Sequence, residues 1–124
     1  IPKSYFDKGD PYQCYCQKTT RLMREKFNDI EIKTTFQSRF GPQEWLKPYT
    51  DKTLEELPKS GVKNLLIICP GFASDCVETL EEINIAGRES FMNSGGKKFD
   101  LIPCLNDNSK HIDLFQHLIK KYIF

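Results

Sequence analysis

The segment that most constrains the fold is a short apolar run followed at once by a turn and an acidic helix. Residues 64–69 (NLLIIC) are bulky and apolar, which is typical of a parallel strand buried on both faces. Pro70 and Gly71 end this strand, and Ser74 or Asp75 can cap the helix that follows. In open α/β proteins, the loop between such a strand and helix lies at the carboxyl edge of the sheet, where ligands bind.

The rest of the chain alternates between strand and helix patterns. We expect helices over about 11–27, 50–59, 75–93 and from 109 to 120 or beyond, and strands over 31–38, 64–69 and 98–102. Helical connections between successive strands favour a parallel sheet that helices cover on its faces. The predicted fold class is therefore α/β, with a parallel sheet flanked by helices in one domain over residues 1–124.

Two features suggest that this domain belongs to something larger. A three-stranded parallel sheet is thin, and the first predicted helix has no strand before it. The chain also begins with Ile1-Pro2 and not with Met. We therefore expect a fragment, one lobe of a two-lobed, Rossmann-like α/β protein.

Composition argues against several kinds of function. The 18 basic and 17 acidic residues leave a formal net charge of +1, which argues against a dedicated nucleic-acid surface. The longest apolar run is far too short to cross a bilayer.

Five cysteines are an odd number, which fits a disulfide framework poorly and favours a reducing cytoplasm. Cys69 is expected in the core, and the C-x-C of Cys14 and Cys16 lacks a second pair of zinc ligands.

Glu78 and Glu82 are the first candidates for chemistry. They lie four residues apart near the start of the acidic helix, so they share one face. One interpretation is a solvated acidic face, which the helix dipole favours near an N-terminus. The other follows from the position at the carboxyl edge of the sheet, where carboxylates can accept protons or hold a divalent cation.

Aromatic and polar side chains elsewhere can complete a ligand site. Trp45, the only tryptophan, either fills the core at the base of its loop or forms a flat wall, and Phe72 can form a second wall. Ser38 and Arg39 end the first predicted strand and suit a ligand with carboxylates, although Arg39 can equally be a surface charge.

Other catalytic signatures are weak or absent from the sequence. His111 and His117 are six residues apart on the last predicted helix, so they do not share a face and are expected at the surface or at a helix end. Nothing matches a P-loop, a G-x-G-x-x-G turn, a nucleophile elbow or a zinc protease pair.

The chain resembles the carboxyl-terminal half of ferrochelatases of the proteobacterial type, the enzymes that insert ferrous iron into a porphyrin to make haem. The resemblance covers nearly the whole chain, and it is specific because its motifs keep their order and spacing. These motifs are Gly9-Asp-Pro-Tyr12, the loop from Phe36 to Asp51 (FQSRFGPQEWLKPYTD), the segment from Cys69 to Ile83 (CPGFASDCVETLEEI), and Gly95-Gly96 through Ile102-Pro-Cys-Leu-Asn106.

The resemblance implies roles for individual residues. Glu78 matches the catalytic glutamate of the family, which takes part in removing pyrrole protons or steering the metal. Glu82 matches the next acid on the same helix face, which is part of a proposed acidic conduit and a candidate metal contact. The positions that match the porphyrin pocket are Ser38, Trp45 and Phe72, together with Tyr12 of the Gly-Asp-Pro-Tyr motif.

The chain departs from the family pattern in several places. Where relatives carry a third acid of the conduit, this chain has Ala86, so we expect a shorter conduit. Where some relatives carry a histidine, this chain has Cys76, which puts a metal-ligand role at that position in doubt. In relatives, the histidine thought to bind metal or accept a proton lies immediately before the position that matches Ile1, so it is not part of this sequence. The chain ends at Phe124 without the extension that binds a [2Fe–2S] cluster in some relatives, so we expect no cluster.

The function implied by the resemblance is insertion of Fe²⁺ into protoporphyrin IX, with protohaem and two protons as products, in the cytoplasm. Iron is then a substrate, no cofactor is bound permanently, and the amino-terminal lobe of the same protein is the partner that completes the cleft. The chain alone is expected to be inactive. Because haem precursors are hydrophobic, peripheral membrane contact of the protein is compatible with this function. Two alternatives stay open: a related chelatase for another metal or tetrapyrrole, and a non-catalytic tetrapyrrole- or metal-binding module.

Overall fold

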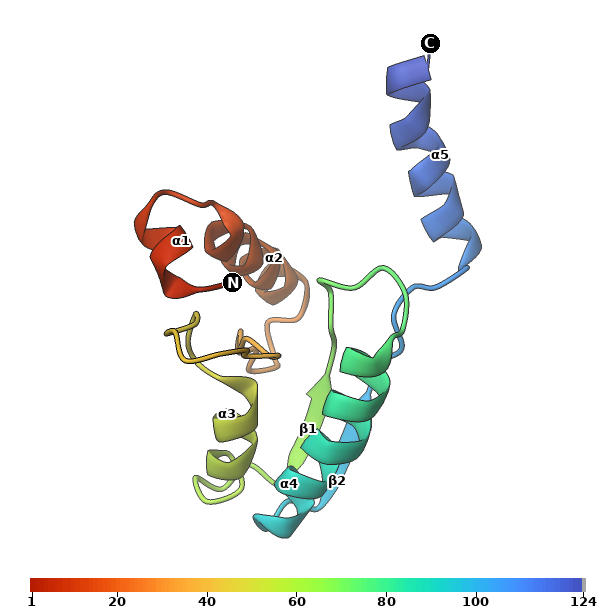
Figure 1. Ribbon diagram of the computed structural model, residues 1–124. Coiled ribbons are helices and arrows are strands. Elements are labelled where there is room, and N and C mark those ends of the chain that lie inside the picture. Colours follow the sequence, from red (N-terminus) through yellow and green to blue (C-terminus); the bar gives the residue numbers. More distant parts are fainter. Residues whose placement is uncertain (124) are drawn as a thin grey trace. The chain divides into compact units, whose positions relative to one another are not determined.

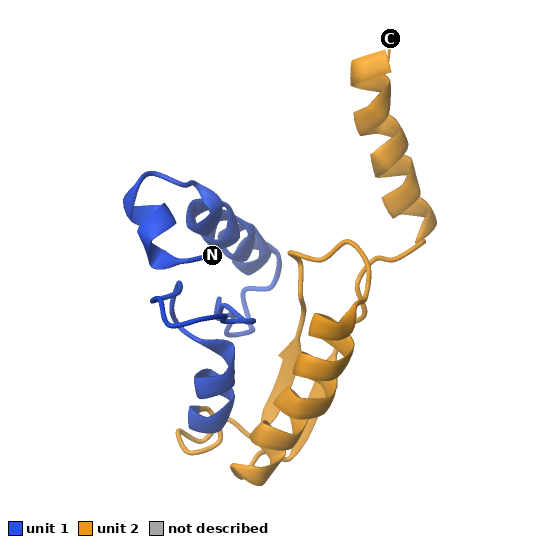
Figure 2. Cartoon of the chain, in the orientation of Figure 1, with its two compact units in different colours: residues 1–56 blue, residues 57–124 orange. Residues whose placement is uncertain are grey.

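The computed structural model describes residues 1–123, which fall into two compact units, residues 1–56 and residues 57–123 (Figure 2). The first unit holds α1 (Lys3–Asp7), α2 (Tyr12–Lys26) and α3 (Thr50–Glu56). The second holds β1 (Asn64–Ile67), the π-helix η1 (Glu78–Gly87), α4 (Arg88–Asn93), β2 (Lys98–Leu101) and α5 (Ser109–Ile123) (Figure 1). In the described part of the chain, each helix is too short or too polar to cross a membrane.

The second unit is built on a parallel pair of strands. β1 and β2 align from Asn64 opposite Lys98 to Ile67 opposite Leu101, and η1 with α4 forms the connection between them (Figure 1). This crossover confirms the predicted α/β class, because parallel neighbours require a long connection that is usually helical.

The predicted strand over 31–38 is wrong. Among the described residues the sheet has two strands, and this segment contributes only an isolated bridge between Phe36 and Tyr49. The Phe36 N–H donates to the Pro48 carbonyl at 2.9 Å, and the Thr50 N–H donates to the Phe36 carbonyl at 3.0 Å. The extended pattern is therefore used in pairing with the loop before α3 and not with β1.

The first unit is held together by its N-terminal residues and the loop over 39–49. The Lys3 N–H donates to the Glu44 carbonyl at 2.8 Å, and the Leu46 N–H donates to the Ile1 carbonyl at 3.1 Å. These bonds pair the start of the chain with the segment around Trp45. The short helix α1 was not predicted, whereas α2 confirms the first predicted helix to within a residue at each end.

The core of the second unit forms where η1 and α4 cover the sheet. Phe91 and Phe99 are almost wholly buried, and their ring centroids lie 5.9 Å apart. Arg88 joins this helix to β2, since its guanidinium lies 5.0 Å from the centroid of the Phe99 ring and hydrogen-bonds the Phe99 carbonyl. Its Nη2 also donates to the Asn84 side chain at 2.7 Å. These contacts anchor the end of η1 and the start of α4 to β2.

Replacing Gly96 with Ala is expected to destabilise the protein. A Cβ at this position would lie 2.1 Å from the Phe91 ring, which is buried and cannot move aside freely. Overpacking of this kind costs about 1–3 kcal/mol in free energy of unfolding, which denaturant titration measures. The neighbouring control Ser94→Ala should change that free energy by less than about 0.5 kcal/mol. An unchanged midpoint for Gly96→Ala would contradict this packing.

Candidate functional site

The acidic pair lies on a helix of an unexpected kind. Glu78 and Glu82 belong to the π-helix η1, whose hydrogen bonds run from residue i to i+5, and such helices are found frequently at functional sites. Residues four apart are still about one turn apart in this wider coil, so the two carboxylates remain neighbours on one face. The expected side-chain cap is wrong, because the residue before the helix is Val77 and no side chain caps it.

Glu78 carries a negative charge at neutral pH. A hydrogen bond from the Cys76 thiol, followed by one from its own backbone N–H, holds the pKa of the Glu78 carboxyl below its usual range. Its side chain is half-buried, as is that of Glu82. The charge also lies at the positive end of the helix dipole. This end of η1 therefore presents an ionised carboxylate that can attract a cation or accept a proton.

The loop before η1 places Phe72 near the end of the apolar strand. The Phe72 N–H donates to the Cys69 carbonyl at 3.1 Å, which closes a turn, and the Phe72 ring is half-buried. Cys69 is buried as predicted, and burial, with a smaller effect of Cys104, raises the pKa of its thiol to about 11. That thiol is protonated at neutral pH, so Cys69 is a core residue and not a nucleophile.

Three predicted porphyrin contacts lie in the first unit. The Trp45 ring is half-buried, and its Nε1–H donates to the Phe40 carbonyl at 2.8 Å, which fixes its orientation. Ser38 is exposed, with a positive φ of 63° in the same loop. Tyr12 begins α2, and its N–H donates to the Asp10 carboxylate at 2.9 Å. The structure therefore groups Ser38 and Trp45 on one loop, while Tyr12 lies at a helix start.

Arg39 is partnered within this loop. It forms an ion pair with Asp51, and its guanidinium lies 4.1 Å from the centroid of the Tyr49 ring. These contacts favour the surface-charge interpretation over a ligand contact. In the second unit, by contrast, Phe72, Glu78 and Glu82 lie on one continuous loop and helix.

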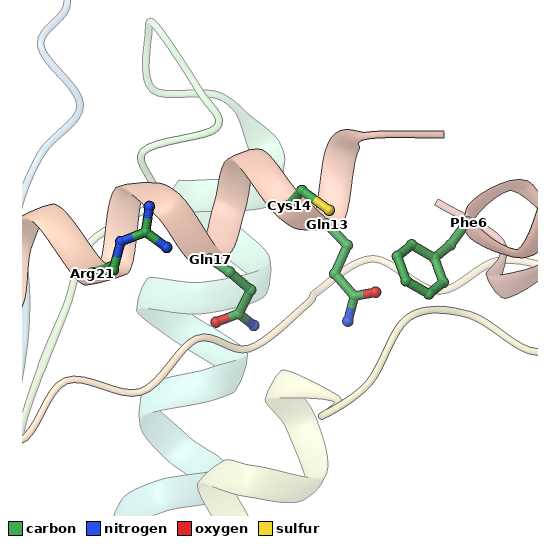
Figure 3. A pocket seen from close by; sticks show the side chains of 5 residues that line it. All are labelled: Phe6, Gln13, Cys14, Gln17 and Arg21. Carbon is green, nitrogen blue, oxygen red and sulfur yellow. The ribbon is translucent and has the colours of Figure 1, made fainter. Parts of the chain in front are cut away.

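The first unit also contains an open cavity of about 360 Å³ between α1 and α2 (Figure 3). Figure 3 shows Gln13 and Gln17 extending from α2, with Phe6 beside Gln13 and Arg21 further along the helix. The Gln13 Oε1 atom is buried and has no hydrogen-bond partner among the described residues. None of the six predicted site residues lines this cavity. No carboxylate or histidine is among the residues that line it.

A cluster at the carboxyl edge of the sheet was missed by the sequence reasoning. Asp75 and Asn106 hydrogen-bond each other across the loops that follow β1 and β2. His111, expected at the surface or a helix end, is buried at the start of α5, with its Nδ1 2.8 Å from the Asn106 carbonyl oxygen. The sequence signals were that Asp75 and Asn106 each lie in one of the family motifs and that Asp75 can cap a helix, and neither signal pairs the two residues.

Among residues 1–123, no group of three or more His, Cys, Asp or Glu side chains is arranged to hold a metal ion. Glu78 and Glu82 can therefore supply two carboxylate ligands to a cation, which is only part of a coordination shell. Two carboxylates suit transient contact with a metal ion better than its permanent binding.

A parallel pair of strands joined by a helical connection defines an α/β protein, and in open α/β sheets ligands bind at the carboxyl edge, where this acidic loop and helix lie. The sequence matches the ferrochelatase family model over residues 1–123. It is 57% identical to the ferrochelatase of Rhizobium meliloti (strain 1021), in an alignment that covers 98% of this chain and 36% of that protein. It is 50% identical to the ferrochelatase of Francisella tularensis subsp. novicida (strain U112), over 99% of this chain and 38% of the relative.

This chain belongs to the ferrochelatase family, which confirms the resemblance seen in its motifs. It spans just over a third of the length of the curated relatives that it matches.

Proposed function

We propose that this chain supplies the acidic wall of a ferrochelatase site, where Fe²⁺ replaces the two pyrrole protons of protoporphyrin IX to give protohaem. The observation that carries the proposal is the ionised Glu78 at the start of η1, with Glu82 about one turn further along the same face. Membership of the ferrochelatase family supports it.

The reaction needs a proton acceptor and a path for the metal. Two N–H bonds break, the two protons leave, and four nitrogen lone pairs bind the Fe²⁺ ion. An anionic carboxylate beside the pyrroles can attract the cation and can accept a proton in the same place. Because the pKa of Glu78 is lowered, its carboxylate is a weak base, so we assign it first to attracting the metal and second to relaying protons.

The aromatic side chains are assigned to the macrocycle. Flat rings such as those of Trp45 and Phe72 pack well against a flat ligand, and contacts of this kind can hold a porphyrin distorted so that its lone pairs tilt out of the plane. The Trp45 ring is already oriented by its bond to the Phe40 carbonyl. Ser38 and Tyr12 add hydroxyl groups for the polar rim of the porphyrin.

The wider setting is part of the same proposal. The relatives are almost three times as long as the aligned segment, so we propose that a further lobe of the same protein completes the cleft. Fe²⁺ is a substrate, and we propose that no resident cofactor or iron–sulfur cluster takes part. The free cysteines favour a reducing cytoplasm as the location.

The experiment is metal insertion by a full-length ferrochelatase that contains this chain. Zn²⁺ serves as an air-stable substitute for Fe²⁺, and porphyrin fluorescence follows its insertion. The 124-residue chain is assayed alongside. We expect insertion by the full-length protein and none by the chain alone. A folded full-length protein that binds porphyrin and inserts no metal would contradict the proposal and favour a non-catalytic binding module.

A further inference from the structure

We propose that Asn106 is a positioning residue of the metallation site: its side chain clasps Asp75 and thereby fixes the loop that leads into Glu78. The inference rests on the proposed function, since it names a residue that supports the same site. Asn106 lies in the loop after β2, whereas Asp75 and Glu78 lie after β1.

The clasp is a reciprocal pair of hydrogen bonds between residues 31 positions apart. The Asn106 Nδ2 donates to the Asp75 carboxylate at 2.8 Å. The Asp75 backbone N–H donates to the Asn106 Oδ1, also at 2.8 Å. A side-chain amide matches this pattern because it carries a donor and an acceptor side by side. The two bonds close a ring that ties one sheet-edge loop to the next.

The backbone of Asn106 is held as firmly as its side chain. Its N–H donates to the Ala73 carbonyl at 3.0 Å, and its carbonyl oxygen lies 2.8 Å from Nδ1 of the buried His111. Its φ of 48° lies in the left-handed region, which asparagine tolerates better than most residues. Every polar group of Asn106 is thus committed to fixing these loops.

From Asp75 the contacts continue into the first turn of η1. The second Asp75 oxygen accepts from the Thr79 hydroxyl at 3.0 Å and from the Cys104 N–H at 3.3 Å. The Thr79 oxygen in turn accepts from the Cys76 N–H at 3.0 Å. Thr79 is fully buried and adjacent to Glu78, so a shift of Asp75 is transmitted to the base of the Glu78 side chain.

Charge supports the same arrangement. The hydrogen bond from Asn106 is the main cause that lowers the pKa of the Asp75 carboxyl, with the Cys104 N–H and the Thr79 hydroxyl adding to it. A carboxylate with both oxygens engaged in this way is a fixed structural anion. Asp75 and Asn106 therefore act on the reaction through Glu78, and small displacements of a reacting group are costly in rate.

The first test is Asn106→Gly in the full-length protein, assayed by zinc insertion into porphyrin. Glycine accepts the positive φ without strain, so the variant removes both side-chain hydrogen bonds of the clasp without forcing the backbone into another conformation. We expect kcat to fall by roughly 10–100-fold, with KM for porphyrin changed by less than about threefold, because geometry and not binding is lost. Asn93→Asp, at the exposed end of α4, is the surface control and should keep the wild-type kcat.

The second test exchanges the two partners. Asp75→Asn and Asn106→Asp should each lower kcat, since the first leaves two amides and the second sets two carboxylates against each other. The double variant restores one amide and one carboxylate with matched donors and acceptors. We expect it to recover kcat to within about threefold of wild type, as a clasp that acts only by position requires.

Three results would overturn the inference. One is a wild-type kcat in Asn106→Gly. Another is a double variant that regains the unfolding midpoint of wild type but not its kcat, which would show that the Asp75 charge itself takes part in the chemistry. An inactive wild-type protein would overturn the proposed function and this role with it, whereas the first two results leave the proposed function intact.

Discussion

Glu78→Ala in the full-length protein is expected to lower kcat for metal insertion by at least about a hundredfold, without unfolding it. The side chain is half-buried at the start of η1, and its ionised carboxylate is the group that we assign to the metal and the pyrrole protons. Glu78→Gln keeps the shape and removes the charge, so it should lose nearly as much. Zinc insertion at saturating porphyrin measures both.

Glu81→Ala is the matched control for this experiment. Glu81 is a carboxylate of the same helix, but it is exposed and is not on the face shared by Glu78 and Glu82. Its replacement should leave kcat within about twofold of wild type, as is usual for surface substitutions. Equal losses at Glu78 and Glu81 would indicate a general charge effect, and normal turnover by Glu78→Ala would remove Glu78 from the site.

The second large effect is on stability. Phe91→Ala should lower the free energy of unfolding by about 3–5 kcal/mol, because it empties the contact between α4 and the sheet. Phe91 is 0% exposed and packs against Phe99. Denaturant titration of the full-length protein measures the loss. Metal insertion should also fall at temperatures where the variant begins to unfold, because η1 continues directly into α4.

Phe40→Ala is the control, since the Phe40 side chain is 81% exposed and its contact with Trp45 uses only the backbone carbonyl. We expect a change of less than about 0.5 kcal/mol. If Phe91→Ala cost no more than Phe40→Ala, the core of the second unit would not lie where the packing places it.

The features that sequence could predict are those with a local physical signal. The apolar run of residues 64–69 predicted β1, because bulky side chains in a short run suit a parallel strand. The expected burial on both faces is wrong, since no residue of β1 is buried and Leu66 is 60% exposed. Pro70 and Gly71 marked its end, and the acids beyond them marked the helix that carries Glu78 and Glu82. The buried state of Cys69 followed from the same pattern.

The features that sequence missed depend on contacts between distant segments. The alternating pattern at 31–38 fits a strand, but its partner proved to be the loop at 48–50, which no local pattern specifies. The π-helix was expected as an ordinary helix, since periodicity does not separate the two types. The clasp between Asp75 and Asn106 joins two loops through a pairing that only the folded sheet creates.

The most direct measurement is the position of the metal in a crystal of the full-length protein with porphyrin and Co²⁺, located by anomalous scattering. Co²⁺ takes ligands similar to those of Fe²⁺. The account predicts an anomalous peak within bonding distance of the Glu78 carboxylate, with the porphyrin centre beside it. A peak that neither Glu78 nor Glu82 contacts, with the macrocycle bound away from η1, would contradict it.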